Sequence, residues 1–209
     1  MKVVLVNGSP KREGNTAGCL GVIARELSKA DIETEIICIG DKGISGCSVC
    51  GACRRDVGRG CVQGGEWFAE TAKKIYAADG LIFATPTYYA GMNGTMKSFM
   101  DRIFYSSNAR MRHKVAAGVA VTRRTGGMTA FQQLNAYFLI SEMLIAPSFY
   151  WNVAYGSVPG DVSRDAEGVS IMQNLAATMA WMLKMKEQTQ KTLPPPAPPA
   201  ERPRTDFIR

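Results

Sequence analysis

Apolar runs alternate with amphipathic stretches along most of the chain. Five runs have the pattern of strands; they span residues 2–6, 33–39, 81–85, 115–122 and 149–155. The first is apolar and rich in β-branched residues, as in a sheet that is covered on both faces, and the second alternates polar and apolar residues. Five stretches repeat apolar residues at helical spacing; they span residues 16–29, 66–77, 93–104, 129–144 and 166–186. The alternation predicts an α/β fold with a doubly wound, five-stranded parallel sheet.

The first predicted strand ends in a loop of turn-forming and small polar residues, residues 7–16. Between a strand and a helix, free backbone N–H groups and the positive end of the helix dipole point at one spot, which suits a phosphate monoester. The loop lacks the glycine spacing of nucleotide-triphosphate and dinucleotide sites, and an ordinary turn with a helix cap is the alternative. The candidate phosphate ligands are Ser9, Lys11, Arg12, Asn15 and Thr16.

Two further loops follow predicted strands, at the position where ligands of open α/β sheets bind. The first offers a proline-fixed turn, two aromatic rings and backbone N–H donors, which suit a planar ring, although it could also be a plain turn before a helix. Its candidate residues are Pro86, Thr87, Tyr88, Tyr89, Gly91 and Met92. The second loop contributes Thr122, Arg123, Gly126 and Gly127.

A glycine- and cysteine-rich segment, residues 41–65, interrupts the α/β pattern. Its four cysteines have the spacing C-x2-C-x2-C-x7-C; they are Cys47, Cys50, Cys53 and Cys61. Thiolates are soft ligands for iron–sulfur clusters and zinc, and two contiguous short gaps favour a [4Fe–4S] cluster over the separated knuckles of zinc sites. Free or disulfide-forming thiols are the remaining alternative. Cys19 and Cys38 lie in a predicted helix and strand, and we expect them to be buried without chemistry.

Composition narrows the classes of function. Hydrophobic residues make up 46% of the 209 residues, but no apolar run reaches the roughly 18 residues of a membrane span. No basic and apolar leader opens the chain, so we expect a cytoplasmic protein. The net charge of +7 suits a phosphorylated cofactor, a nicotinamide nucleotide or an acidic electron-transfer partner. Without any helix-turn-helix or zinc-finger pattern, we do not expect a nucleic-acid partner.

These motifs together resemble a known family. Gly8-Ser9-Pro10-Lys11 and Gly14-Asn15-Thr16 resemble the phosphate loop of the flavodoxin-like FMN reductases. With the cysteine segment inserted between the second strand and the second helix, about residues 1–186 resemble the iron–sulfur flavoproteins of the NAD(P)H-dependent FMN reductase group. The resemblance implies strand order 2-1-3-4-5, FMN phosphate at the first loop and the flavin ring at the second. The third loop would contact the pyrimidine edge of the flavin or a nicotinamide nucleotide phosphate.

The resemblance also implies a function. An FMN-dependent oxidoreductase that carries a [4Fe–4S] cluster would pass electrons between NAD(P)H, or a reduced carrier such as ferredoxin, and a small-molecule or protein acceptor. The chemistry would belong to the cofactors, so no catalytic side chain is assigned. One alternative is an FMN-only NAD(P)H:quinone or nitro-compound reductase with an empty cysteine loop. Another is a non-catalytic redox sensor that uses thiols or a bound metal.

The end of the chain differs from the rest. We expect a flavodoxin-like domain over residues 1–190, with the cysteine-rich loop at residues 41–65, and a proline-rich tail over residues 191–209. The tail carries the apolar residues Phe207 and Ile208, which suit docking on a neighbouring subunit but also suit plain disorder. Together with the family resemblance, this predicts a homodimer or homotetramer.

Overall fold

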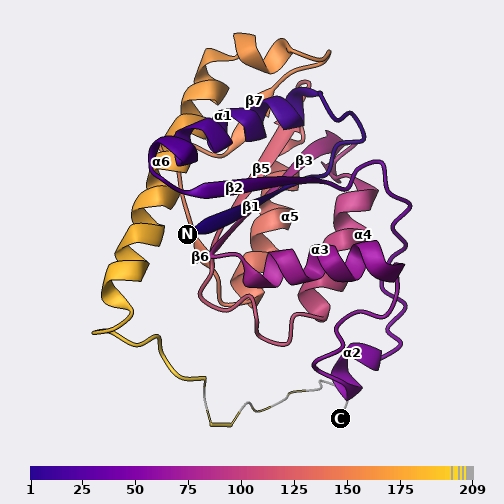
Figure 1. The fold of residues 1–209 in the computed structure, drawn as a ribbon. Helices are drawn as coiled ribbons and strands as arrows, with labels where there is room; N and C mark the ends of the chain where they lie inside the picture. The colour runs from indigo at the N-terminus through magenta and orange to yellow at the C-terminus, as the bar shows by residue number, and fades with distance from the viewer. Residues whose placement is uncertain (199, 202, 204, 206–209) are drawn as a thin grey trace.

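A computed structural model describes residues 1–198, 200, 201, 203 and 205, so Phe207 and Ile208 lie outside the described residues. A largely parallel sheet lies between two layers of helices (Figure 1). The strands are β1 (Lys2–Asn7), β2 (Glu33–Cys38), β3 (Gly80–Tyr88), β4 (Gly91–Met92), β5 (Val115–Thr122), β6 (Leu144–Ile145) and β7 (Val153–Tyr155). The helices are α1 (Asn15–Lys29), α2 (Ala52–Arg55), α3 (Gly65–Ala77), α4 (Gly94–Tyr105), α5 (Gly127–Ile140), the 3-10 turn η1 (Asp161–Arg164) and α6 (Ala166–Thr189).

The doubly wound parallel sheet is confirmed, but its strand count and order differ from the predicted five strands in order 2-1-3-4-5. Within the described residues the sheet has seven strands in the order β2-β1-β3-β5-β6, with β4 paired to β3 and β7 paired to β5. The short β4 is antiparallel to the end of β3, which extends beyond the predicted strand to Tyr88.

Only the end of the predicted strand at residues 149–155 forms a strand, β7, and the shorter β6 precedes that segment at residues 144–145. β6 pairs with the beginning of β5, where Val115 lies opposite Leu144, and β7 pairs with its end. Between the two, Pro147 cannot donate a backbone hydrogen bond. The buried side chain of Asn152 takes over part of the pairing, because its Nδ2 donates to the carbonyl oxygen of Gly118 (3.1 Å).

Two apolar layers bury the sheet. One layer joins α1 and α6 to one face through side chains such as Leu20, Ile23 and Leu175. The other joins α3, α4 and α5 to the opposite face through side chains such as Phe68 and Phe99. Each fully buried Leu or Phe contributes roughly 1.5–3 kcal/mol to folding, so these layers fix the positions of the strand ends.

This arrangement separates two regions of the molecule (Figure 1). The carboxyl ends of the parallel strands share one edge of the sheet, where the loops after β1, β3, β5 and β7 meet. The segment between β2 and α3, which includes α2, lies outside the sheet. α4 begins at the loop edge and ends beside the cysteine segment. None of the helices that the structure describes combines the length and the apolarity needed to span a bilayer.

Candidate functional site

The loop after β1 is curled by hydrogen bonds between its own residues. Asn7 Oδ1 accepts from the backbone N–H of Ser9 (2.9 Å), and Ser9 Oγ accepts from the N–H of Lys11 (3.2 Å). The chain then enters α1 through Gly14, and no side chain caps the helix or places a carboxylate in its first turn. The first N–H groups of α1 and the positive end of its dipole are therefore available to an anion.

A cavity of about 230 Å³ opens between this loop, the end of β3 and the loops after β5 and β7. The predicted ligands that line it are Ser9, Lys11, Asn15, Thr16, Pro86, Thr87, Tyr88 and Arg123. Lys11 and Arg123 bring positive charge, and no Asp or Glu is among the described residues that line the cavity. An anionic, hydrogen-bonding ligand suits this lining.

One polar atom of the lining lacks a partner. Thr87 Oγ1 is buried and, within the described part of the chain, makes no hydrogen bond. Leaving a buried hydroxyl without a partner costs roughly 1–3 kcal/mol. Because Thr87 lines the cavity, the polar edge of a bound ring would supply the missing partner, as the predicted flavin would.

Other predicted ligands lie away from this cavity. Arg12 forms an ion pair with Asp41 (2.6 Å). The side chain of Tyr89 is fully exposed, and Gly91 and Met92 form β4, where the Met92 N–H donates to Gln133 Oε1 (2.9 Å). Three of the candidates predicted in this loop therefore line the cavity from the end of β3, while the rest of the segment turns into a hairpin.

The loop after β5 divides between two cavities. Arg123 lines the first cavity, whereas Gly126 and Gly127 line a neighbouring cavity of about 400 Å³ that also contacts Tyr150 and Trp151. Thr122 is buried, and its Oγ1 donates to the carbonyl oxygen of Thr125 (2.7 Å), which shapes the loop. The adjoining cavities give this edge room for more than one ligand.

The sequence did not predict the loop after β7, which completes the first cavity with Gly156, Ser157 and Pro159. A Cβ on Gly156 would lie 2.4 Å from Asn15 Nδ2, so only glycine fits beside Asn15. The signal was present in the sequence, since a cluster of glycine, serine and proline directly follows the last predicted strand.

Asp161 orders that loop. The backbone N–H groups of Val158 and Ser157 donate to its carboxylate at 2.8 and 2.9 Å, and Arg164 pairs with it. These bonds lower the pKa of Asp161 to about 2, and the bond from the Val158 N–H has the largest effect. The Asn15 side chain ties the same segment to α1, because its Nδ2 donates to the Val158 carbonyl (2.9 Å).

Asn93 also supports the site, although the sequence did not predict this role. It is buried and caps α4 by accepting from the Met96 N–H (3.3 Å). Its Nδ2 also donates to the carbonyl oxygen of Gly8 (2.7 Å), and its Oδ1 accepts from Thr85 Oγ1 (3.1 Å). One amide therefore joins the loop after β1 to β3 and α4. An asparagine at the first position of a predicted helix was the available signal.

The four predicted cluster ligands line one small cavity of about 20 Å³, next to Arg102 and Ser106. Cys53 is buried, Cys47 and Cys61 are half-buried, and Cys50 is exposed. Across the described part of the chain, no three Cys, His, Asp or Glu side chains are grouped closely enough to hold a metal ion. The thiols thus share a cavity without forming a ready-made coordination sphere.

A buried arginine contacts this cavity. Arg102 of α4 has an exposure of 2%, and its Nε lies 3.4 Å from Cys61 Sγ. The helical apolar spacing of residues 93–104 did not predict a buried arginine at position 102. The sequence did contain a sign of this burial, because Arg102 lies three residues after Phe99 and so on the apolar face of the helix.

The remaining cysteines lie elsewhere. Cys19 is buried in α1, where burial raises the pKa of its thiol to about 12. Cys38 at the end of β2 is half-buried, and its Sγ lies 3.8 Å from Asn7 Nδ2. Neither lines the cysteine cavity.

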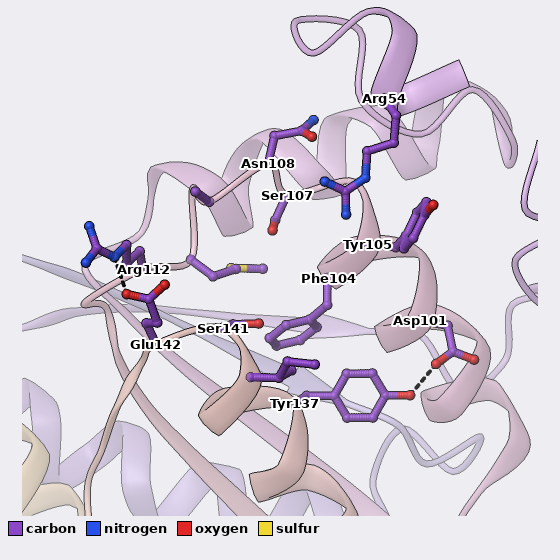
Figure 2. A pocket seen from close by; sticks show the side chains of 13 residues that line it. Arg54, Asp101, Phe104, Tyr105, Ser107, Asn108, Arg112, Tyr137, Ser141 and Glu142 are labelled. Atoms are coloured by element: carbon purple, nitrogen blue, oxygen red, sulfur yellow. Dashed lines mark hydrogen bonds and ion pairs between the residues drawn. The ribbon is translucent and has the colours of Figure 1, made fainter. Parts of the chain in front are cut away.

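A separate groove of about 370 Å³ lies between the ends of α4 and α5 (Figure 2). Arg54 reaches over it from α2, and its guanidinium carbon lies 4.6 Å from the centre of the Tyr105 ring. Asn108 Nδ2 donates to the Cys53 carbonyl (3.1 Å), so this groove borders the cysteine segment.

Comparison with known proteins agrees with this architecture. The family model described as NADPH-dependent FMN reductase matches residues 1–157. An iron–sulfur flavoprotein of Methanocaldococcus jannaschii is 31% identical over 193 residues, which cover 88% of this chain and 98% of that protein. An NADPH azoreductase of a Bacillus strain is 29% identical over 90% of this chain and 98% of its own. The structure of an archaeal flavodoxin superposes with a TM-score of 0.59 at 15% identity, covering 88% of this chain and 99% of that one, and the fold is therefore flavodoxin-like.

Proposed function

Because the chain belongs to the iron–sulfur flavoprotein / NADPH-dependent FMN reductase family, we propose that it binds FMN at the strand-end cavity and a [4Fe–4S] cluster at the cysteine cavity. The chain is an FMN-dependent oxidoreductase. The proposal adds the ligand sets, the cluster and the direction of electron flow: from a nicotinamide nucleotide or a reduced carrier such as ferredoxin, through both centres, to an acceptor.

The observation that carries the flavin part is the cavity itself. It combines an uncapped helix start, two cationic side chains and the unpartnered Thr87 hydroxyl at the carboxyl edge of the sheet. Ser9, Lys11, Asn15 and Thr16 would hold the phosphate, and Pro86, Thr87 and Tyr88 would hold the ring. When bound, FMN supplies hydride and single-electron chemistry, while these residues bind it, orient it and exclude water.

The cluster part is supported by the shared cavity of Cys47, Cys50, Cys53 and Cys61 and by the soft character of four thiolates. The spread of these thiols indicates that a cluster would draw them together as it binds, in the way that metal binding couples to local folding. Asn93 caps the start of α4 beside the strand-end cavity, and Arg102 lies near its end beside the cysteine cavity. The two residues are nine positions apart, a rise of about 14 Å along the helix, so α4 would run between the two centres.

The remaining assignments belong to the same proposal. The name of the azoreductase relative supports NADPH as a donor, and the net charge of +7 suits nucleotides and acidic protein carriers. The end of α6 at Thr189 supports a domain over residues 1–190, with a tail over residues 191–209. We further propose a cytoplasmic homodimer or homotetramer.

The experiment is to purify the protein anaerobically, measure FMN, iron and sulfide per chain, and follow reduction by NADPH in the absorbance spectrum. We expect one FMN, four iron atoms and four sulfides per chain on the basis of the [4Fe–4S] ligand set. FMN without iron would favour an FMN-only reductase, the alternative that the dispersed thiols support. A chain that binds neither would contradict the proposal.

A further inference from the structure

Arg102 carries a positive charge into the interior without a carboxylate partner. Its side chain has an exposure of 2%, and it is the largest fully buried side chain among the described residues. No Asp or Glu of the described part of the chain forms an ion pair with it. Its guanidinium donates only to backbone carbonyl oxygens and to sulfur. A buried charge normally needs a counter-charge, so the cavity beside Arg102 calls for an anion.

The donors of Arg102 join the two ends of the cysteine segment. Nη1 donates to the carbonyl oxygen of Ser45 (3.3 Å), which precedes the first cluster cysteine, and Nη2 donates to that of Gln63, which follows the last. Nε points at Cys61 Sγ. Arg102 therefore attaches both ends of a segment outside the sheet to α4, a helix of the core.

The orientation of the guanidinium is fixed by its neighbours. Its central carbon lies 3.9 Å from the centre of the Phe68 ring, which packs edge-on against Phe99 (5.5 Å between centroids). Gly64 leaves room for it, because a Cβ there would lie 2.6 Å from Arg102 Nη2. A side chain that is stacked, buried and hydrogen-bonded on three sides is preorganised for a charge beside it.

From this geometry we infer that Arg102 is a positioning residue that closes the cysteine segment and neutralises the anionic centre held by its thiolates. The inference rests on the proposed cluster. Reduction of that centre adds one electron, which would come from reduced FMN or from dithionite, and so adds one negative charge. A fixed positive charge in a poorly solvated site stabilises the more negative form, so Arg102 raises the reduction potential of the centre.

The test compares Arg102→Lys, which keeps the charge, with Arg102→Met, which keeps much of the length but has no charge. Each is reconstituted anaerobically, analysed for iron and sulfide, and titrated potentiometrically. We expect Arg102→Met to load several-fold less iron. In the loaded fraction, the reduced form should be stabilised at least tenfold less, which lowers the reduction potential of the centre by about 59 mV for one electron. Arg102→Lys should recover most of both properties.

A matched control is Arg55→Met, because Arg55 is exposed and donates to the Cys50 carbonyl (3.1 Å) in the same segment. It should load and titrate like the wild type. If Arg102→Met loads fully and has the wild-type potential, or if Arg102→Lys is as impaired as Arg102→Met, the role assigned to the charge is contradicted. A wild type that takes up no iron contradicts the proposed cluster instead.

A second readout needs no iron. Trypsin can cut after Arg54, Arg55 and Arg59, which lie inside the segment that Arg102 closes. In the metal-free chain, Arg102→Met should be cut there several-fold faster than Arg102→Lys, because the ends of the segment are no longer attached to α4. Equal cleavage rates for the two variants and the wild type would show that Arg102 does not close the segment.

Discussion

The strand-end cavity and the cysteine cavity are built in different ways. The first is formed by the end of β3 and by the loops after β1, β5 and β7. Hydrogen bonds that Asn7 and Asp161 accept and that Asn93 donates shape these loops. The second is formed by one long segment outside the sheet, held by Arg102 and Asn108. A rigid frame can present a site before its ligand arrives, whereas a segment with few fixed points gains its geometry from the ligand.

The contrast predicts that the two sites respond differently to loss of their ligands. Removing FMN should leave the strand-end loops in place, because their bonds are internal to the protein. Removing iron should loosen residues 45–63 and leave the sheet unchanged. Hydrogen exchange on the protein with each cofactor removed in turn would measure this, and equal protection of residues 45–63 with and without iron would remove the distinction.

The largest effect of a single substitution is expected in the cysteine cavity. Cys61→Ala removes one of four proposed ligands and should lose most of the iron, because the dispersed thiols depend on the full set. Cys38→Ala, which changes a thiol outside the cavity, should keep it. The measurement is the iron content per chain of each variant after anaerobic reconstitution. Full iron in Cys61→Ala together with loss of iron in Cys38→Ala would disprove the ligand set.

Two adjacent cations test the strand-end cavity. Lys11 lines it, whereas Arg12 turns away to Asp41. Losing a hydrogen bond to a charged group costs roughly 1.5–3 kcal/mol, so Lys11→Ala should raise the dissociation constant of FMN roughly 10- to 150-fold. Arg12→Ala should leave it nearly unchanged. Fluorescence titration of the FMN-free protein measures both constants, and equal constants for the two variants would place the phosphate elsewhere.

The rigid frame itself can be weakened at Asn93. Asn93→Ala removes the α4 cap and leaves the Gly8 carbonyl without its donor, so we expect unfolding to require about 2 kcal/mol less free energy. Asn135→Ala is the matched control in α5, because the buried Asn135 Oδ1 has no partner among the described residues. Urea denaturation measures both variants. A loss at Asn93 no larger than at Asn135 would show that the cap does not support the frame.

The sequence predicted best what depends on local pattern. The strand at residues 115–122 has no polar side chain before Thr122 and is buried at every position, and the polar loop before α1 lies where the pattern placed it. Only residues 153–155 of the strand expected at residues 149–155 form a strand, and the contact of Asn152 with Gly118 across the sheet has no local signature.

The sites follow the same rule. Eight of the predicted flavin ligands line one cavity because strand ends meet at one edge whatever the details of the loops. Tyr89, Gly91 and Met92 lie outside this cavity because β3 continues into a hairpin with β4. Arg102 was missed because its partners, Ser45 and Gln63, are 57 and 39 residues away in sequence.

The smallest predicted effect sharpens the contrast by pH. The Asp161 pKa is lowered from the ordinary 3.8 to about 2 in the folded chain, so this carboxylate favours folding fully above pH 3.8, and the contribution is lost as the pH falls toward 2. Asp161→Asn keeps the shape but weakens the bonds to the Val158 and Ser157 N–H groups. In FMN-free protein, its stability deficit relative to the wild type should be constant from about pH 7 to about pH 5 and shrink below about pH 4. Ser163→Ala, an uncharged change in the same turn, should run parallel to the wild type throughout. The urea concentration at the midpoint of unfolding, measured across this pH range, tests the prediction. If the stability deficit of Asp161→Asn persists undiminished at the acid end, the charge of Asp161 does not order the loop. The strand-end cavity would then depend less on internal hydrogen bonds than the contrast with the cysteine segment requires.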